Sequence, residues 1–267
     1  MAFLPSAMEI RNPRSAMRYR LTIAYDGTAF HGWQRQVRVD GSELRTVQGA
    51  VAEAIVQAVQ QPVRLQGASR TDAGVHAVGQ VAHFDAETRI PTERLPDAIN
   101  ARLADDVEVL EARVVPTTFD ACSDAVEKQY RYRLWNTRRR PLGLRHMVYH
   151  CWTSLDIDRM QTAATMLIGE HDFAAFAATG HGRESTVRTV TGCDVQVREP
   201  EVQIVVRGDG FLYNMVRIIA GTLVEVGRAR FEPAHIQTLL AERRRELAGP
   251  TLPPQGLCLE WIRYPEP

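Results

Sequence analysis

The sequence predicts an α+β protein made of two ferredoxin-like (βαββαβ) halves, whose antiparallel sheets meet across a central cleft. Apolar residues alternate along several short runs, they recur at helical spacing between these runs, and the resulting order of elements occurs twice in 267 residues. The halves share this order without a repeat of residues. We therefore expect a flexible N-terminal tail over 1–17, a first domain over 18–120 and a second over 121–267.

The first half contains four predicted strands and two predicted helices. In the first strand, Tyr19, Leu21, Ile23 and Tyr25 fall on one face. Thr46 precedes an apolar stripe at helical spacing and is suited to be its N-cap, and Thr92 is placed in the same way before the second helix. In chain order we expect strand 18–25, helix 46–60, strand 63–68, strand 77–84, helix 92–103 and strand 107–113.

The second half shows the same order of patterns with one additional helix. Its strands are short runs rich in β-branched and aromatic residues, and its helices have apolar residues three and four positions apart. We expect strand 129–135, helix 156–168, strand 187–197, strand 202–207, helix 211–226, helix 233–245 and strand 257–263.

The composition argues against several classes of protein. The 32 basic and 32 acidic residues cancel, which argues against coating nucleic acid by bulk attraction. The four cysteines lie far apart and form no C-x-x-C pair, so neither a zinc site nor a redox motif is indicated. No apolar run reaches the ~20 residues that cross a membrane. We expect a cytoplasmic protein with no metal and no membrane partner.

The stretch SRTDAGVHA, residues 69–77, places an arginine, a carboxylate, a glycine and a histidine in the loop between two predicted strands. One interpretation is a turn, because Asp72 can bond its own backbone and Gly74 tolerates a positive φ. The other is a chemical site, in which Arg70 keeps a half-buried Asp72 ionised, as a nucleophile or base requires. A turn alone has no use for Arg70. We expect His76 to support the loop by hydrogen bonding.

The same stretch strongly resembles the R-T-D-A-G-V-H-A signature of the tRNA pseudouridine synthase A family. Five more blocks resemble that family, in its order and over most of the chain: YDGTAFHGWQRQ, TVQGAVAEAI, LIGEHDFAAF, FLYNMVRIIAGTLVEVG and AGPTLPPQGLCLE. The resemblance implies an isomerase that converts uridine to pseudouridine at positions 38–40 of the tRNA anticodon stem-loop, without cofactor or metal. It also implies a homodimer that holds tRNA across both protomers.

Site residues follow from the resemblance by position. Asp72 matches the family's catalytic aspartate, and Tyr130 in KQYRYRL matches its active-site tyrosine. Arg70, and Arg217 in YNMVR, match the arginines expected near the carboxylate. Ser69 departs from the pattern, because many members have glycine there. This departure concerns which tRNAs are preferred and does not affect the matches at Asp72 and Tyr130.

Two of these residues have structural interpretations as well. Tyr130 shares one strand face with Tyr132 and Leu134, so it can simply belong to the core. Arg217 lies in an apolar helix, where a guanidinium needs either water or a carboxylate. We expect it to pair with Asp72, and the alternatives are two nearby acidic residues, Asp209 and Glu225.

The chemistry implied by the resemblance breaks the bond from ribose C1′ to N1, turns the uracil and rejoins C1′ to C5. Ionised Asp72 can attack C1′, remove a proton from C2′, or attack C6 of the base, and the sequence leaves these routes open. Because a free aspartate already titrates near ~3.9, a neighbouring arginine serves orientation and charge balance more than ionisation.

Arg138, Arg139 and Arg140 lie in a predicted loop, where they can hold tRNA phosphates or simply be solvated. Two rival functions are a catalytically silent RNA-binding protein and a metal-dependent hydrolase. The first has no need for a carboxylate set among arginines. The second needs a ligand cluster, and the candidates His76, His83 and Asp85 match no recognised ligand spacing.

Overall fold

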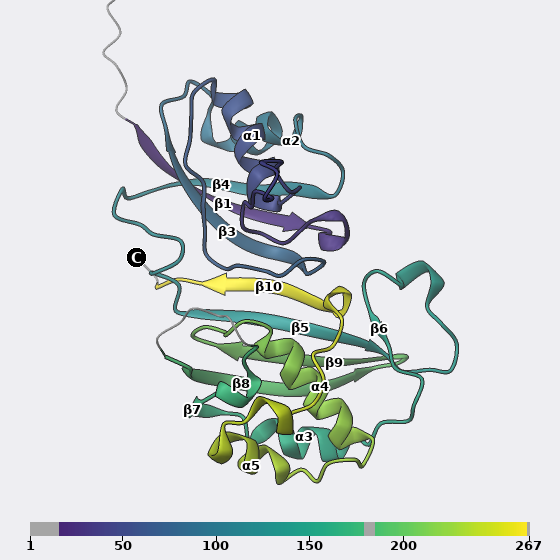
Figure 1. The fold of residues 1–267 in the computed structure, drawn as a ribbon. Helices are drawn as coiled ribbons and strands as arrows, with labels where there is room; N and C mark the ends of the chain where they lie inside the picture. Colours follow the sequence, from purple (N-terminus) through teal and green to yellow (C-terminus); the bar gives the residue numbers. More distant parts are fainter. Residues whose placement is uncertain (1–15, 179–184, 266–267) are drawn as a thin grey trace, which may run out of the picture.

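The computed structural model describes residues 16–178 and 185–265, so most of the tail expected over 1–17 lies outside the described residues. These residues form an α+β fold around one large, mostly antiparallel sheet (Figure 1). Its order is β4-β1-β3-β10-β5-β9-β8-β7, with β2 paired to β3 and β6 to β5. The strands are β1 Met17–Tyr25, β2 Gln66–Gly67, β3 His76–Ala86, β4 Val107–Val115, β5 Glu127–Trp135, β6 Tyr149–His150, β7 Gly169–Asp172, β8 Val187–Arg198, β9 Glu201–Gly208 and β10 Leu257–Arg263.

The helices pack against this sheet in two groups (Figure 1). Helices α1 and α2 accompany strands β1, β3 and β4, whereas α3, α4 and α5 accompany β5, β8 and β9. Among the described residues, no helix combines the length and apolarity needed to span a bilayer. The helices are α1 Val47–Val59, α2 Leu95–Asn100, α3 Ile157–Thr165, α4 Met215–Gly227 and α5 His235–Glu242.

The first strand and first helix confirm the sequence patterns that predicted them. The alternating residues of β1, from Tyr19 to Tyr25, are buried in the core. The Thr46 hydroxyl accepts a hydrogen bond from the Gly49 N–H, so Thr46 is the N-cap of α1. This bond satisfies one of the donors that a helix leaves free at its start.

The last strand, β10, joins the strands of both halves into one sheet. It pairs in parallel with β3 through Cys258 with His76 and Leu259 with Ala77, and antiparallel with β5 on its other side. We expected two sheets that meet across a cleft. The strands instead lie edge to edge, because β10 satisfies the exposed edges of β3 and β5 at once.

Two predicted helices begin later than the apolar pattern indicates. Thr92 is part of a short 3-10 turn, so it does not cap α2, which begins at Leu95 and ends before Leu103. Helix α4 begins at Met215, because Asn214 has left-handed backbone angles (φ 61°, ψ 5°). Asparagine tolerates this conformation better than most residues. Residues 211–214 are therefore released from the helix and lie beside the loop that carries Asp72.

Candidate active site

The loop over residues 69–75 is held in place by the backbone of the N-terminal half. The Trp33 N–H donates to the Thr71 carbonyl at 3.0 Å. Gly32, next to it, has φ +85°, and a Cβ at this position would lie 2.7 Å from the same carbonyl oxygen. Glycine alone combines this backbone angle with so close an approach. The loop therefore has a fixed position against the preceding chain.

Side chains from the sheet brace the same loop. Gln80 is fully buried, and its carboxamide accepts from the Ser69 N–H at 3.2 Å and donates to the Ser69 carbonyl at 2.6 Å. The Tyr25 and Thr71 hydroxyls lie 2.8 Å apart. Sequence reasoning missed Gln80. The available signal was the polar amide of Gln80 in the middle of a predicted strand, since a buried amide has to find hydrogen-bonding partners.

The turn that we considered for Asp72 is present, together with the hydrogen bonds expected from His76. The Val75 N–H donates to the Asp72 carbonyl at 3.1 Å, and Gly74 has φ +79°. His76 Nδ1 accepts from the Gly27 N–H at 3.1 Å, and its Nε2 lies 2.9 Å from the His146 carbonyl oxygen. The turn fixes the backbone and leaves the Asp72 side chain free to face a pocket.

Asp72 and Arg217 are brought together from opposite halves of the chain. Arg217 Nη1 lies 3.2 Å from Asp72 Oδ2 and donates to Asn214 Oδ1 at 2.6 Å, while its Nε donates to the Leu252 carbonyl at 2.7 Å. Both side chains are largely buried, 14% exposed for Arg217 and 22% for Asp72. Two further acceptors, the Leu252 carbonyl and Asn214 Oδ1, therefore orient the guanidinium toward the carboxylate.

The alternative partners of Arg217 are engaged elsewhere. Glu225 pairs with Arg228 and Arg230, each at 2.9 Å, and Asp209 accepts from the Thr189 N–H at 3.1 Å. Along helix α4 the two residues are eight positions apart, which is about two turns, or roughly 12 Å of helix length. The structure therefore favours the pairing with Asp72.

Burial and the ion pair act in opposite directions on Asp72. Desolvation raises the pKa of the Asp72 carboxyl, and the Arg217 guanidinium partly opposes that rise. The balance is a raised pKa, as is expected for a carboxylate in a partly apolar pocket. Arg217 thus lowers the cost of keeping Asp72 ionised in this pocket.

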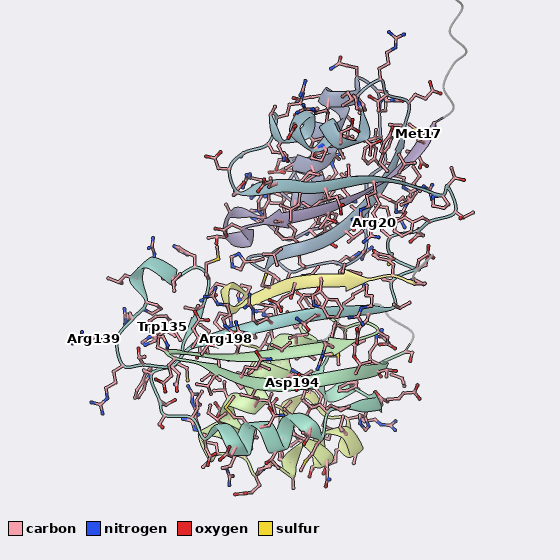
Figure 2. All side chains as sticks on the ribbon, turned by 180° about the vertical axis from the view of Figure 1, so that it is seen from behind. Met17, Arg20, Trp135, Arg139, Asp194 and Arg198 are labelled. Atoms are coloured by element: carbon pink, nitrogen blue, oxygen red, sulfur yellow. The ribbon has the colours of Figure 1, made fainter. Side chains whose placement is uncertain are left out.

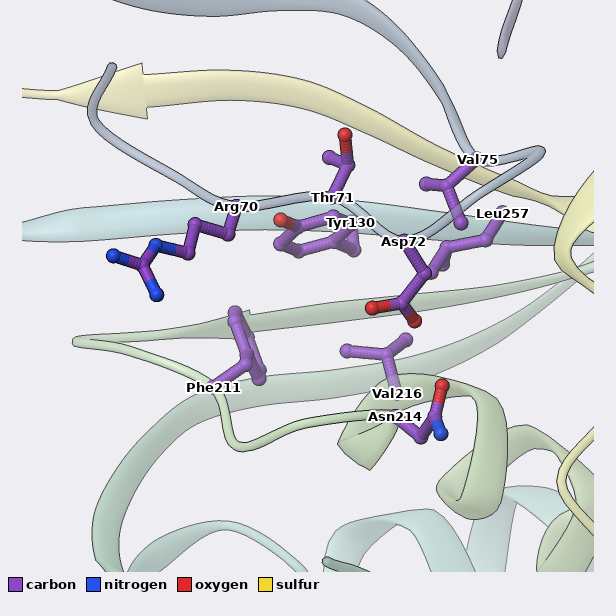
Figure 3. A pocket seen from close by; sticks show the side chains of 9 residues that line it. All are labelled: Arg70, Thr71, Asp72, Val75, Tyr130, Phe211, Asn214, Val216 and Leu257. Atoms are coloured by element: carbon purple, nitrogen blue, oxygen red, sulfur yellow. The ribbon is translucent and has the colours of Figure 1, made fainter. Parts of the chain in front are cut away.

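Tyr130 lines the same pocket from β5 (Figure 3). Its side chain is buried, its ring meets the Phe211 ring edge-on at 5.3 Å, and its hydroxyl lies 3.0 Å from Ser69 Oγ. Burial raises the pKa of the Tyr130 phenol, which therefore stays protonated. The two interpretations of Tyr130 are compatible, since the ring belongs to the buried strand face and also forms a wall of the pocket.

Arg70 lines the pocket without approaching Asp72. Figure 3 shows its guanidinium pointing outward on the far side of Tyr130 from the Asp72 carboxylate, and the side chain is exposed. The expectation that Arg70 holds Asp72 ionised is therefore wrong for this structure, because Arg217 occupies that place. Arg70 is instead positioned at the mouth of the pocket, where it can meet an incoming anion.

Several residues of the pocket were not identified as site residues from the sequence. The Asp72 carboxylate points from its loop toward the start of α4 (Figure 3). Residues 211–214 carry the apolar spacing of a helix, so their pattern does not predict that they turn toward Asp72. The additional lining residues are Thr71, Val75, Phe211, Asn214, Val216 and Leu257.

The arginines at 138–140 lie apart from the pocket, on an excursion that leaves the sheet after Trp135 (Figure 2). Arg138, Arg139 and Arg140 are all exposed, and the Arg139 carbonyl accepts from Trp135 Nε1 at 3.1 Å. The excursion comes back to the chain just after the Asp72 loop, where the His146 carbonyl oxygen lies 2.9 Å from His76 Nε2. Within the described ranges, no group of three or more His, Cys, Asp or Glu side chains is placed to hold a metal ion.

Comparison with known proteins gives a consistent result along nearly the whole chain. A family model described as tRNA pseudouridine synthase matches residues 21–123 and 163–265. A "tRNA pseudouridine synthase A" of Acetivibrio thermocellus is 42% identical over 245 residues, 92% of this chain and 98% of that protein. A protein of the same name from Ruminiclostridium cellulolyticum is 44% identical over 246 residues, again 92% of this chain and 98% of the relative. The chain therefore belongs to the tRNA pseudouridine synthase family.

Proposed function

We propose that the Asp72 pocket is the place where this tRNA pseudouridine synthase isomerises uridine, and that its targets lie at positions 38–40 of the anticodon stem-loop. The observation that carries the assignment is the buried pair of Asp72 and Arg217, which joins the two halves at 3.2 Å beside the Tyr130 ring. A carboxylate placed in this way costs folding energy, and perturbed groups of this kind are concentrated at functional sites.

Asp72 is the proposed catalytic group. The reaction breaks the C1′–N1 bond and forms a C1′–C5 bond, while C5 releases its proton and N1 takes one up, so the atoms balance without a cofactor. Asp72 can start it by attack at C1′, by removing the C2′ proton, or by attack at C6. All three routes need the ionised carboxylate, which Arg217 favours through its charge and its hydrogen bond.

The uracil has to leave its stack before Asp72 can reach it, at a cost of roughly a few kcal/mol. Tyr130 and Phe211 offer aromatic surface at the pocket, and stacking on such rings contributes about 1 to 3 kcal/mol per base. The Tyr130 hydroxyl is suited to assist the proton transfer at C5. We assign Tyr130, Arg70 and Arg217 to substrate binding in this pocket.

The wider assignments rest on the resemblance and on the topology. Arg138, Arg139 and Arg140 are proposed to hold tRNA phosphates, since all three are exposed on one excursion. The strand orders β4-β1-β3 with β2, and β10-β5-β9-β8, support two ferredoxin-like halves over 18–120 and 121–267.

We further propose a cytoplasmic homodimer that needs neither cofactor nor metal. Sedimentation equilibrium with and without tRNA tests the dimer.

The first test is tritium release from tRNA labelled at uridine C5, by the native protein and by Asp72→Asn, each measured with and without EDTA. We expect release by the native protein alone, with tRNA affinity retained in the variant. Normal release by Asp72→Asn would overturn the catalytic assignment. Binding without release by either protein would favour a silent RNA-binding protein, and loss of activity in EDTA would favour a metal-dependent enzyme. Mapping the modified uridines then tests positions 38–40.

A further inference from the structure

We propose that Ser69 is a positioning residue for Tyr130, and that its hydroxyl decides how the Tyr130 hydroxyl faces the substrate. The inference rests on the proposed function of the pocket and adds a residue to it. Ser69 Oγ lies 3.0 Å from the Tyr130 hydroxyl oxygen, across the gap between the Asp72 loop and strand β5. This bond links the two elements that carry the carboxylate and the aromatic ring.

The Tyr130 ring itself has little freedom. Its side chain is 5% exposed, and it is held edge-on by Phe211 with an angle of 88° between the ring planes. The remaining freedom is the direction of the O–H bond about the C–O bond. Among the described residues, Ser69 Oγ is the hydrogen-bonding partner that the structure provides for this hydroxyl.

Ser69 is in turn fixed from behind. The buried Gln80 carboxamide holds both its N–H and its carbonyl, at 3.2 and 2.6 Å. Two residues further on, Thr71 is tied to Tyr25 at 2.8 Å. A loop held at both positions cannot shift to compensate for a lost side chain, so the Ser69 oxygen stays in register with Tyr130.

The two possible directions of this bond have different chemical consequences. When Ser69 donates, the phenolic proton of Tyr130 is released to point into the pocket. When Tyr130 donates, a lone pair of its oxygen faces the pocket instead. Ser69 accommodates both, because a hydroxyl is a donor and an acceptor at once. The serine therefore allows Tyr130 to present either form to the base while its oxygen stays in one place.

The test is a double-mutant cycle between Ser69→Ala and Tyr130→Phe, read as kcat and KM in the tritium assay. In the native background we expect Ser69→Ala to lower kcat about three- to tenfold, the worth of one hydrogen bond, with KM for tRNA unchanged. In the Tyr130→Phe background the same change should alter kcat less than about twofold, because the partner is already absent. Ser69→Thr, which keeps a hydroxyl, should restore most of the activity.

Thr71→Val is the matched control, since it removes a hydroxyl of the same loop that bonds Tyr25 instead. Its effect should be equal in both backgrounds. An equal loss from Ser69→Ala in both backgrounds, or no loss in the native one, would overturn the proposal. The proposed function has separate criteria: it fails when the native protein releases no tritium or when Asp72→Asn releases it normally, and neither outcome depends on Ser69.

A spectroscopic measurement keeps the test decisive if Tyr130→Phe is inactive. The ultraviolet resonance Raman bands of tyrosine respond to hydrogen bonding at the phenol. A difference spectrum between each variant and the same variant carrying Tyr130→Phe isolates Tyr130, also in Thr71→Val, where the Tyr25 hydroxyl loses its partner. We expect Ser69→Ala to shift these bands and Thr71→Val to leave them in place. Unchanged bands in Ser69→Ala would show that the hydroxyl of Ser69 does not orient Tyr130.

Discussion

Replacing Arg217 with glutamine tests how the site keeps Asp72 ionised. The change removes the charge that lies 3.2 Å from the carboxylate but keeps a side chain able to hydrogen-bond. A hydrogen bond to a charged group contributes about 1.5 to 3 kcal/mol. Because 3.2 Å is longer than the best charge-assisted bonds, we take the lower end and expect kcat/KM to fall about ten- to thirtyfold.

The pH dependence carries the more specific expectation. Burial already raises the pKa of Asp72, and Arg217 is the group that opposes this rise. In the proposed mechanism, activity needs the ionised form of Asp72, so we expect activity to decline as the pH falls through the pKa of Asp72. Without Arg217 that pKa rises further, and the acidic limb of the kcat/KM profile moves to higher pH.

The assay is the tritium release profile from pH 4 upward, about the range in which carboxyl groups titrate. Arg217→Lys is expected to lose activity with a smaller shift of the acidic limb, because one ammonium keeps the charge but cannot reach Asp72, Asn214 and Leu252 together. Arg228→Gln is the matched control, as it removes a largely buried arginine near the other end of α4. An acidic limb that stays in place in Arg217→Gln, or moves as far in Arg228→Gln, would refute the reasoning.

Three further predictions concern the supports of the site and the binding of tRNA. Gly32→Ala should lower the free energy of unfolding by more than about 1 kcal/mol and reduce kcat, as measured by urea titration and tritium release. Gly41→Ala is the control, because Gly41 has a similar φ but open space around it. It should lower the free energy of unfolding by less and leave kcat unchanged. Thr46→Ala should lower the free energy of unfolding by about 1 kcal/mol through loss of the N-cap, and Thr46→Ser should restore most of it. Alanine at 138–140 should weaken tRNA binding and reduce its salt slope by about 0.7 to 0.9 per lost phosphate contact, measured by filter binding. Alanine at 243–245, directly after α5, is its control, and an equal loss there would argue against a specific phosphate site.

The elements that sequence reasoning predicts well are those that local chemistry controls. The alternation in β1 and the cap at Thr46 are visible within a dozen residues, and both are confirmed. The start of α4 is not visible in this way, since FLYN carries the same apolar spacing as the helix that follows. Asn214 turns the chain there because its side chain meets Arg217, a contact that depends on the tertiary fold.

The site shows the same division between local and long-range information. The motif around Asp72 can be recognised in the sequence because its residues are contiguous. Tyr130 and Arg217 were predicted as site residues only through the resemblance to the family. The prediction that Arg70 lies beside Asp72 is wrong, because residues that are close in sequence need not have side chains that are close in space. The backbone of the loop directs the two side chains to opposite sides of Tyr130 (Figure 3).

The position of β10 explains why the pocket needs both halves of the chain. Asp72 precedes β3 and Tyr130 lies on β5, and β10 pairs with both strands in one sheet. Leu257, the first residue of β10, lines the pocket between them, and the Leu252 carbonyl just before it aims Arg217 at Asp72. The strand that joins the two halves of the sheet therefore also sets the distance between the carboxylate, the ring and the guanidinium. A change that weakens β10 should disturb catalysis before it unfolds either half, because neither half contains the site alone.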